Sequence, residues 1–192
     1  MVGTLDWTPA LERRDLLAAP VADALARLAG TGATGTAATG DVLVAEIDPD
    51  LADTAAFCAR YDVPLDISAN CVVLAAKRER LRQLAACVVL ATTRADVNGV
   101  ARRTLDARKA SFAPMDAAVA ETGMEYGGIT PVGLPPAWPL LVDDLVAATD
   151  RVVVGSGVRR SKLLLPGPVV AGLPGAVVLE GLAVRATNEA TD

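Results

Sequence analysis

Apolar residues in this chain come in short runs that glycine and proline repeatedly interrupt, and this pattern limits the possible folds more than any other feature. The 192 residues include 16 glycines and 12 prolines. The longest apolar runs, Cys71 to Ala76 and Leu84 to Ala91, fall well short of the roughly 20 residues that a membrane-spanning helix needs. The N-terminus lacks the basic and then apolar pattern of a signal peptide. We therefore expect a soluble, cytoplasmic protein with a single core.

The first half of the chain alternates helical and strand-like segments. Residues 8–28 predict a helix with Thr8 as its N-cap and Pro9 in its first turn. The Gly/Thr/Ala segment 30–40 matches G-x-G-x-x-G, but it follows a helix and precedes a strand, the reverse of a dinucleotide-binding loop, so we interpret it as a linker. We expect strands at 41–47, 69–76 and 85–93, a charged connection at 77–83, and helices at 53–64, 96–109 and 113–122, the last capped by Gly123.

The second half contains short apolar runs that are typical of strands in a mixed or antiparallel sheet. They cover residues 138–143, 151–157, 162–165 and 175–181. Helices that are segregated from such strands favour the α+β class over a doubly wound sheet. We expect an N-terminal helix and linker over residues 1–40, the main domain over 41–185, and a frayed tail over 186–192.

The chain contains no histidine, which removes several kinds of chemistry at once. Ser-His-Asp catalysis, Cys-His catalysis and His-ligated metal sites are excluded. Cys58, Cys71 and Cys87 are odd in number and widely spaced in apolar sequence, so we expect buried, reduced thiols rather than disulfides. Any catalysis must use backbone groups, carboxylates, hydroxyls, Lys, Arg or the substrate itself, and we expect neither a metal nor a cofactor.

Basic residues are concentrated in parts of the chain although its formal net charge is −5. Residues 77–109 contain nine Lys or Arg and three Asp or Glu, a local charge of 9 − 3 = +6. Arg151, Arg159, Arg160 and Lys162 form a second basic group. In the folded chain these residues form either a positive face that holds phosphates or a set of scattered, solvated side chains. The sequence leaves both readings open.

Residues 123–135, GMEYGGITPVGLP, concentrate glycine and proline in one stretch. Glycine lets the backbone approach a ligand closely, and proline braces a turn. The segment 127–131 is therefore suited to directing backbone N–H groups at one point. Such groups stabilise the oxyanion that forms when water attacks a carbonyl, a reaction that needs no histidine. The alternative is a tight connection without function.

Four segments follow one another along the chain: ARYDVPLDISANCVVLAA, ATTRADVNGVARRTLDARKASFAPMDAAVAETGMEYGGITPVGLP, PLLVDDLV and RVVVGSGVRRSKLLL. In this fixed order they resemble the YbaK/ProX family of aminoacyl-tRNA deacylases, which includes trans-editing factors and the insertion domain of bacterial prolyl-tRNA synthetase. The resemblance covers roughly residues 50–182.

The resemblance implies an α+β domain with a mixed, barrel-like β-sheet decorated with helices, which hydrolyses the ester between a wrong amino acid and tRNA. The family's G-x-x-x-P loop, whose backbone amides hold the carbonyl, corresponds to Gly127, Gly128, Ile129, Thr130 and Pro131. A hydroxyl of the terminal ribose helps to activate the attacking water in this family. The implied partners are the aminoacylated 3′ end of tRNA and, as a further candidate, an aminoacyl-tRNA synthetase.

One departure from the family pattern falls at Asn70. Family members usually carry a lysine here, which contacts the tRNA end. Asn70 forms hydrogen bonds but has no charge, and one charge-assisted contact is worth about 1.5–3 kcal/mol. Lys77 lies seven positions further along, and we expect it at the far end of the strand. Three other cations are candidates for tRNA contact: Lys109, Arg159 and Lys162.

Other candidate residues each have a functional and a structural interpretation. Tyr126 stacks on the terminal adenine or packs against the protein. The Thr130 hydroxyl lies beside the bound carbonyl or stabilises a turn. Asp143 orients the site or selects the amino acid's ammonium group, or it caps a turn. Gly155 and Gly157 let the strand end approach the substrate with Ser156 exposed between them, or they form a β-bulge.

The leading hypothesis is a standalone trans-editing hydrolase that removes a small amino acid, with tRNA(Pro) among the candidate carriers. The alternative is a weakened binding module for aminoacyl-tRNA or a related acyl-adenosine compound, because Asn70 replaces the family lysine. A purely structural domain would leave the 127–131 loop without a role. Small apolar differences between amino acids are worth only about 1–3 kcal/mol, so the sequence does not identify the amino acid.

Overall fold

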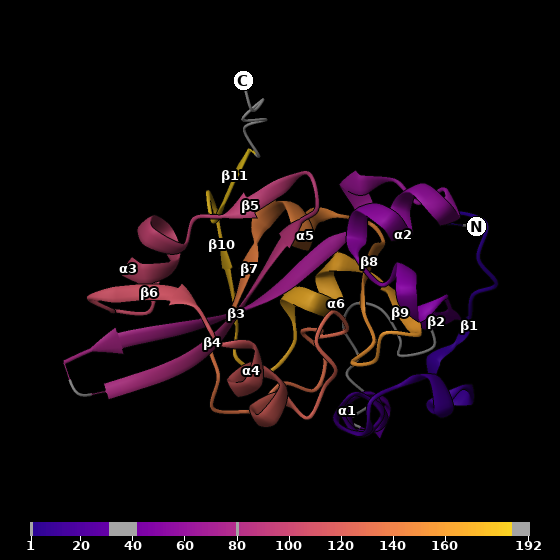
Figure 1. Ribbon diagram of the computed structural model, residues 1–192, viewed down its shortest axis with the longest axis horizontal. Coiled ribbons are helices and arrows are strands. Elements are labelled where there is room, and N and C mark those ends of the chain that lie inside the picture. The colour runs from indigo at the N-terminus through magenta and orange to yellow at the C-terminus, as the bar shows by residue number, and fades with distance from the viewer. Residues whose placement is uncertain (1, 31–41, 80, 186–192) are drawn as a thin grey trace.

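The computed structural model describes residues 2–30, 42–79 and 81–185, and these residues form an α+β fold (Figure 1). An antiparallel sheet has the strand order β1-β2-β9-β8, a mixed sheet has the order β10-β7-β4-β3-β6, and β11 pairs with β5. The strands are β1 Thr8–Pro9, β2 Leu43–Glu46, β3 Ala69–Arg78, β4 Leu81–Leu90, β5 Thr93–Ala95, β6 Lys109–Phe112, β7 Leu140–Asp143, β8 Val152–Gly155, β9 Ser161–Leu165, β10 Ala176–Leu179 and β11 Ala183–Arg185.

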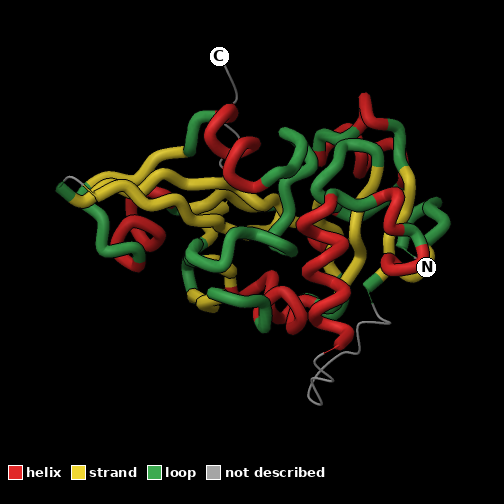
Figure 2. Tube along the Cα trace, turned by 90° about the horizontal axis from the view of Figure 1, so that it is seen from below, coloured by secondary structure: helices red, strands yellow, loops and turns green. Residues whose placement is uncertain are grey.

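The helices are short and lie between or beside these strands. The α-helices are α1 Ala19–Gly30, α2 Thr54–Tyr61, α3 Arg102–Thr104, α4 Met115–Thr122, α5 Asp144–Ala148 and α6 Gly167–Ala171. Short 3-10 helices are η1 Ala10–Glu12, η2 Arg14–Leu16, η4 Pro49–Leu51 and η5 Leu65–Ile67, and η6 Val97–Ala101 is a π-helix. Figures 1 and 2 show the β3–β4 hairpin extending from one end of the molecule, with β1, β2, β8 and β9 at the other end.

The expected α+β class and mixed sheet are confirmed, but the sheets do not close into a barrel. An isolated parallel bridge pairs Ser68, the residue before β3, with Val153 of β8. Within the residues that the structure describes, no named strand of one larger sheet pairs with a strand of the other. The sheets are therefore mixed, as expected, without forming a closed barrel.

One large core joins the N-terminal helix to both sheets. Val21 and Leu25 of α1 pack with Val88 of β4, Leu163 of β9 and Met124, and all five are buried. The N-terminal helix therefore contributes to the same core as the rest of the chain. The expected linker at 31–40 and tail at 186–192 lie outside the described residues, so the expected division into segments stays a prediction.

The helix expected over residues 8–28 is α-helical only from Ala19. Thr8 and Pro9 instead form β1, which pairs with Val44 and Leu43 of β2. Pro20 explains the difference, because proline breaks a helix interior but fits a first turn, where its missing N–H is not needed. The N-terminal helix signal was therefore at Pro20 rather than at Pro9.

Two charged segments also differ from expectation. The predicted connection 77–83 belongs mostly to strands, because β3 runs to Arg78 and β4 begins at Leu81. The predicted helix over 96–109 ends at Thr104; Asp106 has a left-handed φ of 48°, and β6 begins at Lys109. In contrast, α4 ends at Gly123 with φ of 65°, as its sequence predicts.

Candidate functional site

A pocket of about 460 Å³ lies at the open edge of β3. Strand β6 pairs with β3 only from Leu74 to Lys77, so residues 70–73 of β3 form a wall of this pocket. The start of α2, the loop after α4, and parts of β8 and β9 complete it. Its volume falls in the range of about 300–1,000 Å³ that is typical of small-molecule sites.

Three exposed apolar side chains line the pocket. Phe112 is 63% exposed, Tyr126 59% and Met115 56%, which makes them the most exposed large hydrophobic residues in the described part of the chain. Exposed apolar groups that gather at one place mark binding sites, and aromatic rings provide stacking surfaces for nucleobases. The pocket is thus suited to a ligand that carries a base.

The loop after α4 is fixed to the β8–β9 connection by a ladder of hydrogen bonds. The Glu125 amide donates to the Gly157 oxygen and the Gly157 amide to the Gly128 oxygen, both over 2.8 Å. The Arg159 amide donates to the Glu125 carboxylate over 2.6 Å. Gly127 has a φ of 86°, in the left-handed region that favours glycine. The loop conformation is therefore determined by both its glycines and its partner strands.

Two backbone amides of this loop are available at the pocket. Gly127 and Ile129 line the pocket, and within the described residues neither amide donates to a protein acceptor. The Gly128 amide donates to the Glu125 oxygen over 2.9 Å and closes a turn. Gly128, Thr130 and Pro131 do not line the pocket. Of the five residues expected to hold the carbonyl, Gly127 and Ile129 are therefore the two that line the pocket.

Gly155 lets the loop lie directly on β8. A Cβ atom at Gly155 would be 2.3 Å from the Gly128 oxygen and 2.8 Å from the Ile129 oxygen. A Cβ atom at Gly128 would be 2.6 Å from the Val158 backbone. Because these neighbours are backbone atoms, any side chain at either position would displace the loop.

Lys162 brings a buried amine to the pocket. Its side chain is on β9 and is 6% exposed; Nζ donates to the Ala52 oxygen over 2.8 Å and lies 5.2 Å from the Phe57 ring centre. No ion pair of the described residues includes Lys162. Burial lowers the pKa of Lys162 to about 8; nearby Cys58 and Asp53 act against this shift, and Arg159 adds to it.

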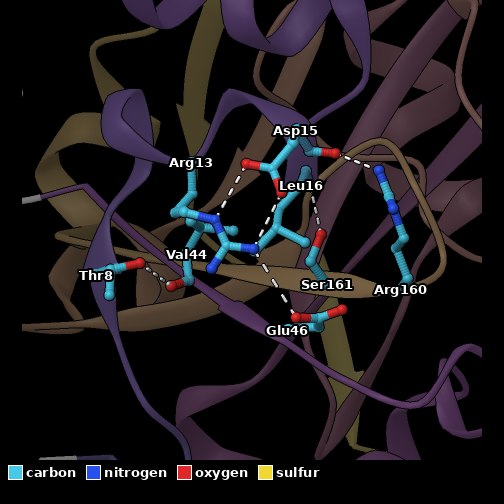
Figure 3. Close-up of polar contacts among 8 residues, drawn as sticks. All are labelled: Thr8, Arg13, Asp15, Leu16, Val44, Glu46, Arg160 and Ser161. Atoms are coloured by element: carbon cyan, nitrogen blue, oxygen red, sulfur yellow. Dashed lines mark hydrogen bonds and ion pairs between the residues drawn. The ribbon is translucent and has the colours of Figure 1, made fainter.

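The N-terminal segment supports the start of β9, next to Lys162 (Figure 3). The Ser161 hydroxyl donates to the Leu16 oxygen, and the Arg160 guanidinium donates to the Asp15 oxygen. Ser161 is 1% exposed, so these bonds hold the strand inside the molecule. Residues before the matched family segments therefore help to position Lys162.

Two polar side chains at the start of α2 and β3 face the same pocket. The Thr54 hydroxyl donates to Asn70 Oδ1 over 2.6 Å, which leaves the Asn70 amide nitrogen to donate elsewhere. Asp53 is the N-cap of α2, and its Oδ1 accepts from the Ala55 and Ala56 amides. Within the described residues, Asp53 Oδ2 accepts no hydrogen bond, so it can receive a donor from a ligand.

The cysteines are free, and none is suited to act as a nucleophile. Cys58 and Cys87 are buried, whereas Cys71 is partly exposed and lines the pocket. Burial raises the pKa of Cys71 well above its ordinary value and that of Cys87 to about 12. The thiols of Cys71 and Cys87 therefore stay protonated near neutral pH.

Two expected site residues have structural contacts instead. Asp143 is 1% exposed and accepts hydrogen bonds from the Leu145 and Ala183 amides, over 3.2 and 2.8 Å; burial raises its pKa. Ser156 is fully buried and hydrogen-bonds to Ser161, so the expectation of an exposed Ser156 is wrong. Neither residue lines the pocket, because both satisfy buried backbone or hydroxyl groups within the fold.

The remaining candidates are divided between the pocket and more distant positions. Thr130 Oγ1 is buried without a hydrogen-bond partner among the described residues. Arg159 donates to the Pro49 and Tyr126 oxygens beside the pocket. Lys109 is on β6 opposite Lys77, which confirms that Lys77 lies at the far end of β3. Gly157, with φ of 86°, belongs to the ladder that holds the loop.

Sequence reasoning missed Asp53, Phe112 and Met115. Asp53 is the first residue of the helix expected over residues 53–64, and this position alone gave no indication that its second oxygen is left to accept from a ligand. Phe112 and Met115 reach the pocket only because β6 pairs with β3, a contact between distant segments. Within the described residues, no helix is long and apolar enough to cross a membrane. The same residues hold no group of three or more His, Cys, Asp or Glu placed to bind a metal.

Comparisons with known proteins agree with this fold. A candidate trans-editing enzyme for prolyl-tRNA synthetase has a TM-score of 0.65 at 20% identity, over 84% of this chain and 96% of that chain. The hypothetical protein APE2540 has a TM-score of 0.61 at 22% identity, over 69% of this chain and 85% of that chain. No curated protein gives a significant match. The model of the aminoacyl-tRNA editing domain matches residues 48–171, and the chain therefore belongs to the aminoacyl-tRNA editing domain family.

Proposed function

We propose that this chain is a trans-editing hydrolase that cleaves the ester bond of a mischarged aminoacyl-tRNA carrying a small amino acid. The observation that carries the proposal is one pocket that combines the Lys162 amine with two backbone amides, those of Gly127 and Ile129, that donate to no acceptor among the described residues. Family membership supports the class of substrate. tRNA(Pro) is the first carrier to test.

In this proposal, the amides of Gly127 and Ile129 bind the ester's carbonyl oxygen. Water attacks the carbonyl carbon, and the two amides stabilise the resulting oxyanion. The ester's bond to the ribose oxygen then breaks, and that oxygen takes up the proton that the water loses. A neighbouring ribose hydroxyl orients the water, so the reaction needs neither a histidine nor a thiolate.

Lys162 supplies the positive charge that Asn70 lacks. Both residues line the pocket, and the Lys162 amine keeps two donors after its bond to Ala52. A buried amine without a carboxylate partner destabilises the fold, so a role in binding explains its position. We assign it to an oxygen of the terminal nucleotide, with the Asn70 amide as a second donor.

Asp53 replaces Asp143 as the candidate for recognising the amino acid's ammonium group. It lines the pocket, and its Oδ2 accepts no hydrogen bond from the described residues, whereas both oxygens of Asp143 accept hydrogen bonds from backbone amides of the fold. No ion pair joins Asp53 to Lys162 among the described residues. Asp53 is thus available to accept from the ammonium group, and Lys162 to donate to an oxygen of the nucleotide, as binding of an aminoacyl nucleotide requires.

The alternative is a binding module with little hydrolysis, which the neutral Asn70 favours. Single-turnover deacylation of tRNAs charged with alanine, cysteine, serine and threonine, including mischarged tRNA(Pro), distinguishes the two. Selective hydrolysis of one ester by the wild-type chain supports the hydrolase. Binding without hydrolysis by the wild type, with hydrolysis gained by Asn70→Lys, supports the module.

A further inference from the structure

Three cations lie side by side across the far end of the mixed sheet. Lys77 of β3 is the direct partner of Arg82 on β4 and of Lys109 on β6. Directly paired residues share one face of a sheet, with Cβ atoms about 5 Å apart. All three side chains are exposed. We call this row, Arg82–Lys77–Lys109, the cation row.

The fold does not neutralise the cation row. The ion pairs near it join Arg78 to Asp106 and Arg108 to Glu79, and within the described residues none includes a member of the row. Like charges directly opposite each other destabilise a sheet. The whole chain has a net charge of −5, so this positive surface is local rather than a result of composition. A ligand with several negative charges would relieve the repulsion.

The cation row lies on the same sheet face as one wall of the pocket. Lys77 and Val73 are four residues apart on β3, so their side chains point to the same face, about 13 Å apart along the strand. Val73 lines the pocket and packs against Ala118 and Trp138. At about 3.4 Å per nucleotide in a stacked strand, this separation corresponds to roughly four nucleotides.

We propose that the cation row binds the phosphate backbone of tRNA, a few nucleotides before the aminoacylated end that occupies the pocket. This inference deepens the proposed function and rests on it for the identity of the RNA. Exposed Lys and Arg side chains on three neighbouring β-strands fit phosphates spaced along one RNA strand better than they fit a compact anion. The contact is to the backbone and is independent of base sequence.

The test is the salt dependence of binding of uncharged tRNA, measured for the wild type and for the triple variant Lys77→Gln, Arg82→Gln, Lys109→Gln. Three lost phosphate contacts reduce the slope of log K against log salt by about two to three. A matched triple variant, Arg14→Gln, Arg27→Gln, Arg60→Gln, removes the same charge from exposed positions elsewhere and leaves the slope nearly unchanged.

Folding is monitored separately by thermal unfolding. The melting temperature of the cation-row variant stays equal to that of the wild type or rises, because like-charge repulsion is removed. An unchanged salt slope in a folded cation-row variant overturns the inference. An equal reduction of the slope in the control variant, or an absence of tRNA binding by the wild type, also overturns it. Binding of uncharged tRNA involves no hydrolysis, so failure of the proposed activity would be seen separately, in the deacylation assay.

Discussion

The Lys162 amine donates a hydrogen bond of 2.8 Å to the Ala52 oxygen and is thereby held at the wall of the pocket. Lys162 comes from β9 and Ala52 from the segment before α2, so the contact joins residues 110 positions apart. This contact places a cation in the pocket although position 70 is an asparagine.

Removing the charge of Lys162 should impair activity without unfolding the chain. Lys162→Met should lower kcat/KM by about 10- to 100-fold, the effect of one lost charge-assisted contact. Its melting temperature should stay the same or rise, because an apolar group replaces a buried, unpaired ammonium. Lys162→Arg keeps the charge and should retain more activity. Wild-type rates in Lys162→Met, or a loss that follows a lower melting temperature, would contradict this role.

The pH dependence of kcat/KM should report the protonation of Lys162. Burial lowers the pKa of Lys162 from 10.5 to about 8, so the amine is charged below pH 8 and neutral above it. After subtraction of the enzyme-free rate, kcat/KM should fall about tenfold per pH unit above 8. In Lys162→Arg this alkaline decrease should disappear, since arginine stays protonated. An alkaline decrease that persists in Lys162→Arg would assign it to another group.

The lowered pKa of Lys162 also makes stability depend on pH, and stability changes with pH in the direction opposite to kcat/KM. Between pH 8 and 10 the unfolded chain binds more protons at Lys162 than the folded chain, so this residue makes the free energy of unfolding rise with pH. Lys162→Met should lack this contribution. Urea unfolding of both proteins at about pH 7.5 and at about pH 9.5 measures the difference.

Asp53 can be tested without loss of its helix cap. Asparagine caps a helix as well as aspartate does, so Asp53→Asn should leave the melting temperature nearly unchanged. If Asp53 binds the ammonium group, the wild type should hydrolyse a free aminoacyl ester about tenfold faster than its N-acetylated form. The variant should lose this preference. An equal preference in both proteins would exclude Asp53 as the ammonium acceptor.

Thr130 and Thr122 form a matched pair of buried threonines with opposite expectations. Thr130 Oγ1 has no hydrogen-bond partner among the described residues, so Thr130→Val should raise the free energy of unfolding, by about 1 kcal/mol. The Thr122 hydroxyl donates to the Ala118 oxygen over 2.7 Å and accepts from the Met124 amide, so Thr122→Val should lower it. Urea unfolding measures the free energy of unfolding of both variants, and Thr130→Val should be the more stable of the two. A Thr130→Val variant that is less stable than the wild type would show that the Thr130 hydroxyl has a partner.

Much of the fold could be predicted from local sequence signals. The apolar runs that became β3, β4, β7, β8, β9 and β10 were recognised, and so was the glycine that ends α4. These features depend on residues that are close in sequence. The N-terminal helix was placed too early because Pro9 was assigned to its first turn, whereas Pro20 is the proline in the first turn of α1.

The composition of the pocket could not be predicted in the same way. Lys162 reaches it because β9 pairs with β2, with Lys162 opposite Ala45, and because the N-terminal segment holds Ser161. The cation row likewise depends on the register between β3, β4 and β6. Such long-range registers decide which charged side chains meet, and sequence periodicity determines only the face on which each lies.

The measurement that tests the central claim most directly is the single-turnover deacylation rate of Gly155→Ala, compared with wild type and Gly30→Ala. A Cβ atom at Gly155 would meet the Gly128 oxygen at 2.3 Å and displace the loop, whereas one at Gly30 meets no atom of the described residues within 4 Å. If the Gly127 and Ile129 amides stabilise the oxyanion, Gly155→Ala should lose about 100-fold or more in rate, while Gly30→Ala keeps it. Binding of uncharged tRNA by Gly155→Ala should persist and shows that the variant is folded. A folded Gly155→Ala variant that hydrolyses the ester at the wild-type rate would contradict the assignment of this loop as the hydrolytic site.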